Sequence, residues 1–199
     1  MDDPAIPWDD ELALVRKGDE AAARRLVEAL YPKVIRIIRN HLPVTEDEQD
    51  ISQEVFMKMF TKLEQFRSQQ PFDHWVARIA LNTCYDRLRR QKARRVISFG
   101  DFPNEEASLL QDMMVARESD PMENAPVASA ASVEVLEKLL ATLKPGEQMI
   151  LRLLDLEERS VAEICELTGW GASRVKVTAF RARRKLAETF RRLESSSAL

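Results

Sequence analysis

The sequence is poor in glycine and cysteine: its 199 residues include five of the former and two of the latter. Glycine weakens helices, whereas alanine, leucine, glutamate and arginine, which are abundant here, form them readily. No stretch of useful length alternates between apolar and polar residues as a half-buried strand does. The composition therefore predicts an all-α fold.

Long apolar runs are also missing. No run of about 18 apolar residues occurs, so no membrane span is predicted. The N-terminal stretch MDDPAIPWDDE is acidic and lacks the basic region and apolar core of a signal peptide. Cys84 and Cys165 fall on apolar faces of different predicted helices, and we expect both to be reduced in a cytoplasmic protein. The two histidines form no ligand cluster with them, so no metal or other cofactor is predicted.

The net charge of −3 conceals a strong separation of charge along the chain. Residues 72–95 carry seven Lys or Arg against two Asp, a net of +5, and residues 171–192 carry eight against one Glu, a net of +7. Residues 101–123 carry seven Asp or Glu against one Arg, a net of −6. Two basic segments separated by an acidic one indicate two contacts with a single polyanion.

The first basic segment, residues 72–95, is predicted to be a helix with two different faces. Apolar and small residues recur at helical spacing and predict one buried face. A second stripe carries residue types that bind nucleic acid, which favours a nucleic-acid surface over a merely solvated basic helix. The preceding loop, FRSQQP at 66–71, is either a pocket for an unstacked base or an ordinary connection. The second stripe consists of His74, Arg78, Asn82, Tyr85 and Arg89.

The stretch from Glu46 to Phe66 is predicted to be a helix whose first two turns are acidic. Five carboxylates lie between residues 46 and 54, with no Lys or Arg among them. Acidic residues stabilise a helix N-terminus through the helix dipole, but five exceed what capping needs. The surplus indicates either a docking face for a basic partner or a helix stabilised only by its dipole.

Two small helical domains joined by a flexible linker are predicted. The first domain, residues 9–96, begins with a short helix and a long one that Asp19 caps and that Pro32 bends or interrupts. The linker, residues 97–132, contains three prolines and many acidic residues. The second domain is predicted over 133–194. The ends of the chain are predicted to be tails, at 1–8 and 195–199.

The second domain has the pattern of a helix-turn-helix. Predicted helices at 133–143 and 147–156 precede a helix that starts with a capping box of Ser160 and Glu163. A Gly-Trp-Gly turn at 169–171 then leads into a last, basic helix, as in DNA-binding helix-turn-helix proteins. A helical hairpin that does not bind DNA is the alternative. One side of the last helix, near its start, carries the residue types that meet base edges: Arg174, Val177, Thr178 and Arg181.

The two blocks together resemble an extracytoplasmic-function (ECF) sigma factor of the sigma-70 family. RKGDEAAARRLVEALYPKV at 16–34, DEQDISQEVFMKMFTKLEQF at 47–66 and FDHWVARIALNTCYDRLRRQKARR at 72–95 are similar to sigma region 2. LATLKPGEQMILRLLDLEERSVAEICELTGW at 140–170 and FRARRKL at 180–186 are similar to region 4. Many relatives carry Thr-Val-Lys-Ser-Arg where this chain has Arg-Val-Lys-Val-Thr at 174–178.

The resemblance implies a bacterial, cytoplasmic promoter-specificity subunit. It would bind the clamp helices and flap of core RNA polymerase and direct promoter recognition, DNA melting and initiation. The implied polymerase-binding residues are Asp47, Asp50, Gln53 and Glu54. Residues implied to bind the −10 region are Phe66, Arg67, Arg78, Asn82, Tyr85, Arg89, Arg90, Arg94 and Arg95. For the −35 region they are Arg174, Lys176, Val177, Thr178, Arg181, Arg184 and Lys185.

Further expectations concern partners and single residues. The resemblance implies an anti-sigma factor or other regulator as a partner, and no membrane insertion. Phe66 and Asn82 are expected near a flipped base. Trp75 matches the family pattern but lies on the predicted apolar face, so we expect it to pack in the core.

Two other classes of protein stay open. One is a helix-turn-helix repressor or activator that dimerises on a palindrome, although no dimerisation helix or ligand domain is evident and the acidic helix would be unexplained. The other is a regulator that binds and sequesters a sigma factor. An enzyme is not expected, because no nucleophile–base pair, phosphate loop or metal set is present.

Overall fold

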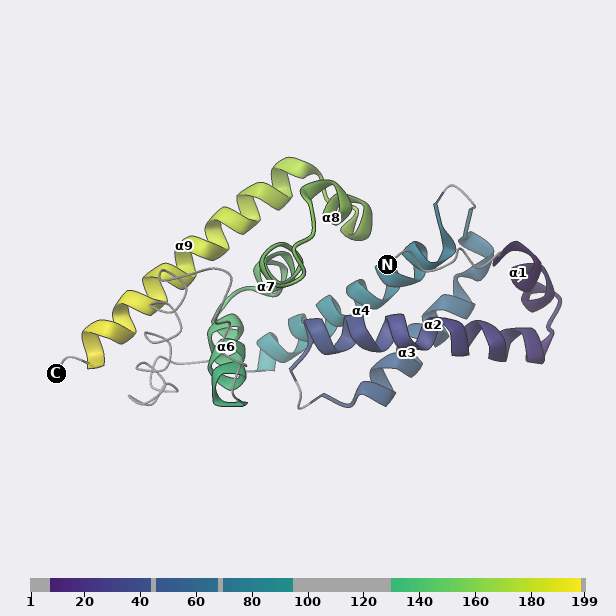
Figure 1. Ribbon diagram of the computed structural model, residues 1–199, viewed down its shortest axis with the longest axis horizontal. Coiled ribbons are helices and arrows are strands. Elements are labelled where there is room, and N and C mark those ends of the chain that lie inside the picture. Colours follow the sequence, from purple (N-terminus) through teal and green to yellow (C-terminus); the bar gives the residue numbers. More distant parts are fainter. Residues whose placement is uncertain (1–7, 44–45, 68–69, 95–129, 198–199) are drawn as a thin grey trace, which may run out of the picture. The chain divides into compact units, whose positions relative to one another are not determined.

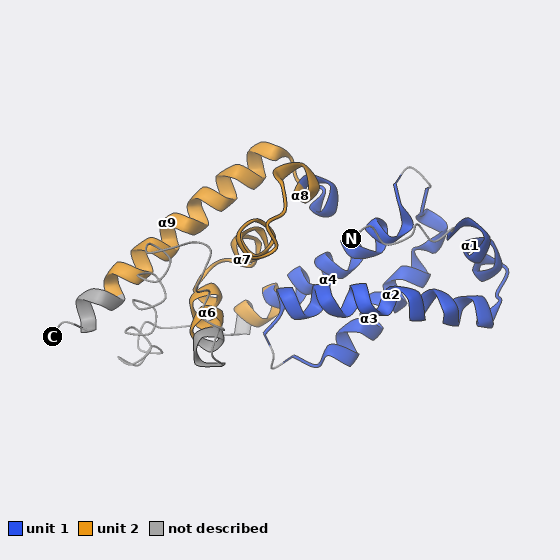
Figure 2. Cartoon of the chain, viewed as in Figure 1, with its two compact units in different colours: residues 1–88, 165–169 blue, residues 89–164, 170–199 orange. Residues whose placement is uncertain are grey.

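The computed structural model describes residues 8–43, 46–67, 70–94 and 130–197 (Figure 1). Every regular element in these ranges is a helix, so the predicted all-α fold is confirmed. The chain folds as two compact units, Met1–Leu88 with Cys165–Gly169, and Arg89–Ile164 with Trp170–Leu199 (Figure 2). Most of the predicted linker, 97–132, lies outside the described residues.

The first unit is built from a short helix, three longer helices and one 3-10 turn. The long second helix continues through Pro32 without a break. The third helix ends at Thr61, earlier than the predicted end at Phe66, and a 3-10 turn follows it. The elements are α1 (Trp8–Arg16), α2 (Glu20–His41), α3 (Glu48–Thr61), η1 (Leu63–Gln65) and α4 (Phe72–Arg94), of which the residues up to Leu88 belong to this unit.

Aspartates cap both α2 and α3. The carboxylate of Asp19 accepts a hydrogen bond from the backbone N–H of Ala22 at 2.9 Å, which confirms the predicted cap. Asp47 accepts from the N–H groups of Gln49 and Asp50 at 2.9 and 3.2 Å. Asp47 therefore has a structural role at the helix start, whatever else it binds.

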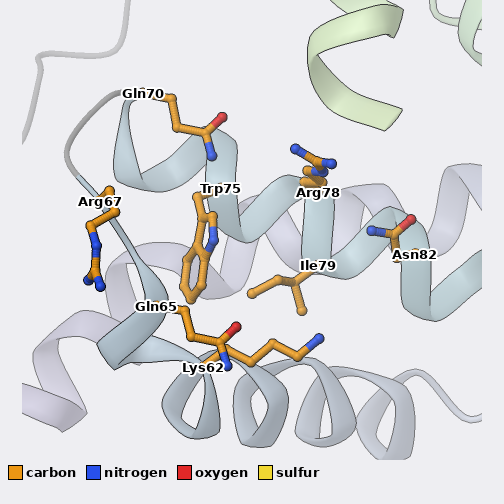
Figure 3. A pocket seen from close by; sticks show the side chains of 8 residues that line it. All are labelled: Lys62, Gln65, Arg67, Gln70, Trp75, Arg78, Ile79 and Asn82. Carbon is orange, nitrogen blue, oxygen red and sulfur yellow. The ribbon is translucent and has the colours of Figure 1, made fainter. Parts of the chain in front are cut away.

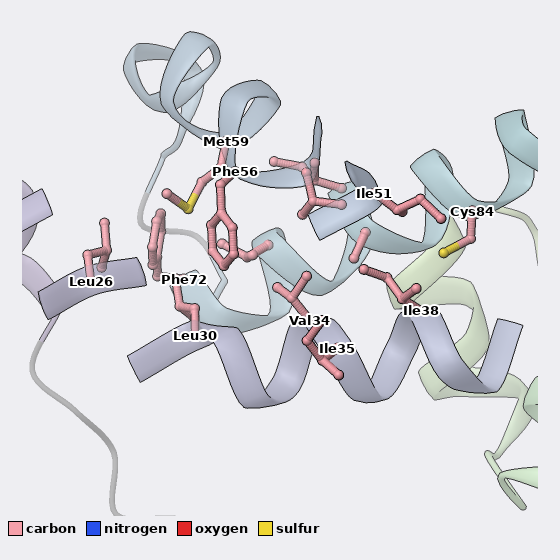
Figure 4. Close-up of a cluster of buried hydrophobic side chains, with 14 of the residues drawn as sticks. Leu26, Leu30, Val34, Ile35, Ile38, Ile51, Phe56, Met59, Phe72 and Cys84 are labelled. Carbon is pink, nitrogen blue, oxygen red and sulfur yellow. The ribbon is translucent and has the colours of Figure 1, made fainter. Parts of the chain in front are cut away.

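The core of the first unit lies between α2, α3 and α4. Figure 4 shows side chains of α2 pointing toward side chains of the other two helices. Their spacing of three and four residues puts one stripe of each helix in the core, as the sequence pattern predicts. Each fully buried large side chain contributes about 1.5–3 kcal/mol. The buried residues include Leu26, Leu30, Val34, Ile38, Ile51, Val55, Met59, Phe72, Val76, Ala80 and Cys84.

Polar contacts also fasten α4 to its neighbours. Lys58 of α3 donates a hydrogen bond to the hydroxyl of Thr83 at 3.1 Å. Arg87 donates to the carboxylate of Glu46 at 2.7 Å, which raises the pKa of Arg87. Lys33 of α2 pairs with Asp73. Burial alone would raise the pKa of Asp73, but the hydrogen bond and charge of Lys33 outweigh it and leave that pKa below its ordinary value.

The second unit contains a helix-turn-helix. Its first helix begins at Ala130, before the predicted start at residue 133, and a five-residue π-helical segment follows the second. Val135 and Leu139 pack against Leu186 and Phe190 of the last helix. The elements of this part of the chain are α6 (Ala130–Thr142), α7 (Pro145–Leu151), η3 (Arg152–Leu156), α8 (Val161–Thr168) and α9 (Ala172–Ser197), and the residues of α8 from Cys165 on are grouped with the first unit.

The cysteines and the lengths of the apolar helices can be compared with the sequence predictions. Cys84 is buried and Cys165 is half-buried, and both are free thiols. Within the described ranges, no helix combines the length and the apolar character needed to cross a membrane.

The predicted capping box at the start of α8 is confirmed. The Ser160 hydroxyl donates to the Glu163 carboxylate at 2.7 Å, and the Ser160 backbone N–H donates to it at 2.9 Å. The backbone N–H of Glu163 in turn donates to the Ser160 hydroxyl at 3.2 Å. The hydrogen bond from the Ser160 hydroxyl has the largest effect on the pKa of Glu163, and that from the Ser160 backbone N–H the next largest. Together they lower this pKa below its ordinary value of 4.5.

Ser160→Ala should lower the free energy of unfolding by about 1 kcal/mol at pH 7. A carboxylate with a lowered pKa stabilises the fold above its unfolded pKa, and this contribution disappears as the pH falls through the folded pKa. The difference between Ser160→Ala and the parent should therefore shrink below pH 4.5. Urea unfolding followed by circular dichroism at several pH values measures it. Ser173→Ala, an exposed position in α9, is the control; a deficit for Ser160→Ala that persists unchanged at low pH would contradict the carboxylate's role.

Candidate nucleic-acid interface

A hollow of about 640 Å³ lies beside the first half of α4 (Figure 3). Its volume is in the range of small-molecule sites, roughly 300–1,000 Å³. Three of its eight lining residues are cationic, three are amides and two are apolar, and none is a carboxylate. The lining residues are Lys62, Gln65, Arg67, Gln70, Trp75, Arg78, Ile79 and Asn82.

This lining suits an unpaired nucleotide. Amide side chains both donate and accept hydrogen bonds, as the edge of a base requires. Lysine and arginine attract the phosphates on either side of the base. The indole of Trp75 offers an aromatic surface, on which bases stack without regard to sequence. The hollow therefore combines the three kinds of contact that an unpaired nucleotide needs.

The structure brings three of the predicted −10 residues together at the hollow. Arg67, Arg78 and Asn82 line it, and Arg67 also donates to the Glu64 carbonyl at 2.8 Å. Tyr85 is half-buried further along the same helix. Of the other predicted −10 residues, Arg89 and Arg90 follow Tyr85 on α4 and are exposed. The side chains of Arg94 and Arg95 lie outside the described part of the structure.

Phe66 does not occupy the predicted position on the surface. It is 5% exposed, and its ring centroid lies 5.0 Å from that of Phe72 and 5.4 Å from that of Trp75. A ring enclosed in this way offers little surface to a base, so its burial argues against the expected contact of Phe66 with DNA. Trp75 packs on the same cluster and also lines the hollow.

The acidic surface of α3 also faces outward. Asp50 and Gln53 are exposed, whereas Glu54 forms an ion pair with Lys58 at 2.7 Å. Met57, 62% exposed, lies on the same face and was not predicted as a site residue. Its signal in the sequence is an apolar residue outside the buried 51/55/59 stripe. The surface thus combines acidic and amide side chains with one exposed apolar side chain.

On α9, the burial of Val175, Ala179 and Ala182 turns the opposite side outward. Val177 is 47% exposed and Phe180 is 67% exposed. Phe180 is the residue that the sequence reading missed here, although it falls outside the buried stripe and precedes Arg181. Apolar side chains on such a face can meet thymine methyl groups in the major groove. The other predicted members Arg174, Lys176, Arg181 and Arg184 are exposed, and Thr178 is half-buried.

Several cations of α9 are engaged within the protein. Arg183 donates to Asp155 through its Nε at 3.2 Å, and this hydrogen bond raises its pKa. Arg184 pairs with Glu188 at 2.9 Å, an exposed pair of the kind that contributes little and is easily exchanged. Lys185, a predicted −35 contact, donates to the Thr142 carbonyl at 2.9 Å. Its ammonium group is thus turned toward the end of α6, which argues against a contact with DNA.

A helix-turn-helix with an exposed basic helix, together with a second basic helix beside an amide-lined hollow, defines a nucleic-acid-binding protein. Comparison with protein families gives the class. Residues 26–94 match Sigma-70 region 2, and residues 134–186 match Sigma-70 region 4. The chain belongs to the sigma-70 family of RNA polymerase sigma factors, as a member of the ECF type.

Similar proteins cover most of the chain. ECF RNA polymerase sigma factor SigW of Bacillus subtilis is 27% identical over 90% of this chain and 94% of its own length. ECF RNA polymerase sigma-E factor of Escherichia coli K12 is 28% identical over 85% of this chain and 86% of its own. The fold is similar to that of CnrH, solved in complex with the cytosolic domain of CnrY, with a TM-score of 0.50 and 21% identity over 90% of this chain and 94% of CnrH.

The burial of Phe66 generates a prediction. Phe66→Leu removes part of a core ring, and full truncation of a buried phenylalanine costs about 3–5 kcal/mol. The variant should unfold at a lower temperature but keep its affinity, with core RNA polymerase present, for an unpaired non-template oligonucleotide. Trp75→Leu, the matched change at the hollow, should lose affinity. Equal losses of oligonucleotide affinity in the two variants would return Phe66 to the DNA contacts.

Proposed function

We propose that this chain directs core RNA polymerase to promoters and holds a base of the opened −10 region in the hollow beside α4. The observation that carries the proposal is the lining of that hollow: three cations, three amides and an indole, with no carboxylate. The family supplies the role in transcription initiation, and the geometry supports the particular step.

Capture of an unpaired base explains why these residue types lie together. Extruding a base costs a few kcal/mol in lost stacking and pairing. Hydrogen bonds from Asn82 and stacking on Trp75 would offset that cost, since each stacked base contributes about 1–3 kcal/mol. Arg67 and Arg78 would bind the flanking phosphates. Tyr85, Arg89 and Arg90 would continue this track along α4.

Docking on core polymerase is proposed for the acidic face of α3. Asp50, Gln53 and Met57 are exposed there, and the charged groups suit a basic partner surface. Asp47 and Glu54 are engaged as a helix cap and in an ion pair, so we assign them supporting roles. The flap of the polymerase is the proposed partner of the second domain.

Recognition of the −35 element is proposed for α9. Arg174 and Arg181 would donate to guanine, and Val177 and Phe180 would contact thymine methyl groups. Lys176, Thr178 and Arg184 would reach the adjacent backbone or bases. In this proposal the chain consists of a region-2 domain at 9–96, which acts at the −10 element, and a region-4 domain at 133–194, which contains α9. The linker joins the two domains.

A regulatory partner completes the proposal. CnrH was solved with the cytosolic domain of CnrY bound, and we propose that a regulator, such as an anti-sigma factor, binds this chain as well. Work beside RNA polymerase implies a cytoplasmic location.

The decisive experiment is run-off transcription with bacterial core polymerase on DNA of the source organism. Discrete start sites that need the chain are expected, because the acidic face and the two basic helices would act together. Asp50→Lys should remove these transcripts. Asp10→Lys, the same charge reversal at an exposed position of α1, should keep them. A chain that binds specific DNA alone without yielding transcripts would favour a repressor or activator, and one that does neither would favour a sequestering regulator.

Asn82→Ala should impair promoter opening more than polymerase binding. The loss of one amide at the hollow removes hydrogen bonds made only to the extruded base, which are worth about 0.5–1.5 kcal/mol each. The yield of open complex, measured by permanganate reactivity, should fall while the affinity for core polymerase stays unchanged. Asn40→Ala, the same substitution at an exposed position of α2 outside the hollow, is the control. Equal open-complex yields from Asn82→Ala and the parent would refute the base pocket.

A further inference from the structure

The turn of the helix-turn-helix holds an aromatic ring against a candidate reading residue. Trp170 lies in the turn before α9, and Arg174 lies in the first turn of that helix. The guanidinium carbon of Arg174 is 3.6 Å from the centroid of the Trp170 ring. This separation is well inside the limit of about 6 Å for a cation–π interaction, and tryptophan is the ring that forms the strongest ones.

Arg174 is held differently from its neighbours on the helix. Arg183 and Arg184 donate their N–H groups to the carboxylates of Asp155 and Glu188. Within the described residues, Arg174 forms no ion pair with a carboxylate. A ring face attracts a guanidinium through its π electrons, whereas a carboxylate would accept hydrogen bonds from its N–H groups. As far as the described part of the chain extends, the five N–H donors of Arg174 therefore stay available to a ligand.

Such an arrangement prepares an arginine for bidentate recognition. An exposed arginine loses rotamer freedom when it binds, and a side chain already held in place loses less. Arg174, Thr178 and Arg181 are four and three residues apart, so they share one side of α9. The ring thus holds the guanidinium at the edge of the face proposed to read base edges.

We propose that Trp170 is a positioning residue, which holds the guanidinium of Arg174 for a two-hydrogen-bond contact with one guanine of the −35 element. The inference rests on the function proposed for α9 and names the base that this part of it reads.

The test compares base preferences of four variants. The full chain, assembled with core polymerase, selects from a DNA library randomised across the −35 segment. Arg174→Ala should abolish the preference for guanine at one base pair. Trp170→Leu should lower that preference about three- to tenfold and leave other positions unchanged, and Trp170→Phe should keep most of it. Trp170→Leu should have no further effect when Arg174→Ala is already present.

The outcomes separate the inference from the proposed function. If Arg174→Ala loses a guanine preference and Trp170→Leu does not, the positioning role is wrong and the recognition helix stands. If Arg174→Ala changes no preference, the recognition-helix assignment falls and the positioning role with it. A Trp170→Leu loss that is uniform over all sequences, or that persists beside Arg174→Ala, would assign Trp170 to phosphate contact or to packing instead.

The stack can also be measured without DNA. The ring current of an indole shifts the NMR signals of groups above its face. The side-chain δ protons of Arg174 should be shifted upfield in the free protein and return to ordinary positions in Trp170→Leu. Thermal unfolding of each variant shows whether it is folded. Ordinary δ-proton positions in the folded parent would overturn the inference.

Discussion

The packing of α4 against α2 and α3 is the constraint on which the first unit depends. One stripe of α4, including Val76, Ala80 and Cys84, is buried. A helix that buries those positions must turn Arg78 and Asn82 outward, because they lie on another side of the same turns. The hollow follows from this orientation, with Lys62 and Gln65 after α3 forming its other wall. The core therefore positions the amide and the cation that α4 contributes to the hollow, Asn82 and Arg78.

The same packing joins two surfaces with different proposed partners. Lys58 pairs with Glu54 on the acidic side of α3 and donates to Thr83 of α4. Arg87 of α4 reaches the carboxylate of Glu46, just before α3. Both contacts are polar and only partly buried, so each is worth little alone. Their value is geometric: the acidic face and the hollow belong to one packed body, and docking by one would orient the other.

Sequence patterns predicted the parts of the structure that depend on local spacing. Buried stripes, the Asp19 cap and the Ser160–Glu163 box are set by residues three or four apart, and all are present. The burial of Phe66 was not predicted, because this residue lies in a connection with no periodicity. Its burial depends on the rings of Phe72 and Trp75, which pack against it. Met57 and Phe180 were not predicted as site residues, although each is an apolar residue outside the buried stripe of its helix. The partners of Arg183 and Lys185 lie 28 and 43 residues away, and no local pattern indicates them.

The basic helix α9 shows why the net charge of a segment is a poor measure of what it offers to DNA. Residues 171–192 have a net charge of +7, but Arg183 is held by Asp155 and Lys185 by the end of α6. A cation that is already paired within the protein cannot neutralise a phosphate, and so release a counterion from DNA, until its partner is displaced. Arg174 is different, because the Trp170 ring orients it without neutralising it. The difference between a carboxylate and an aromatic partner thus separates Arg183, which is held within the fold, from Arg174, which keeps its donors for a ligand.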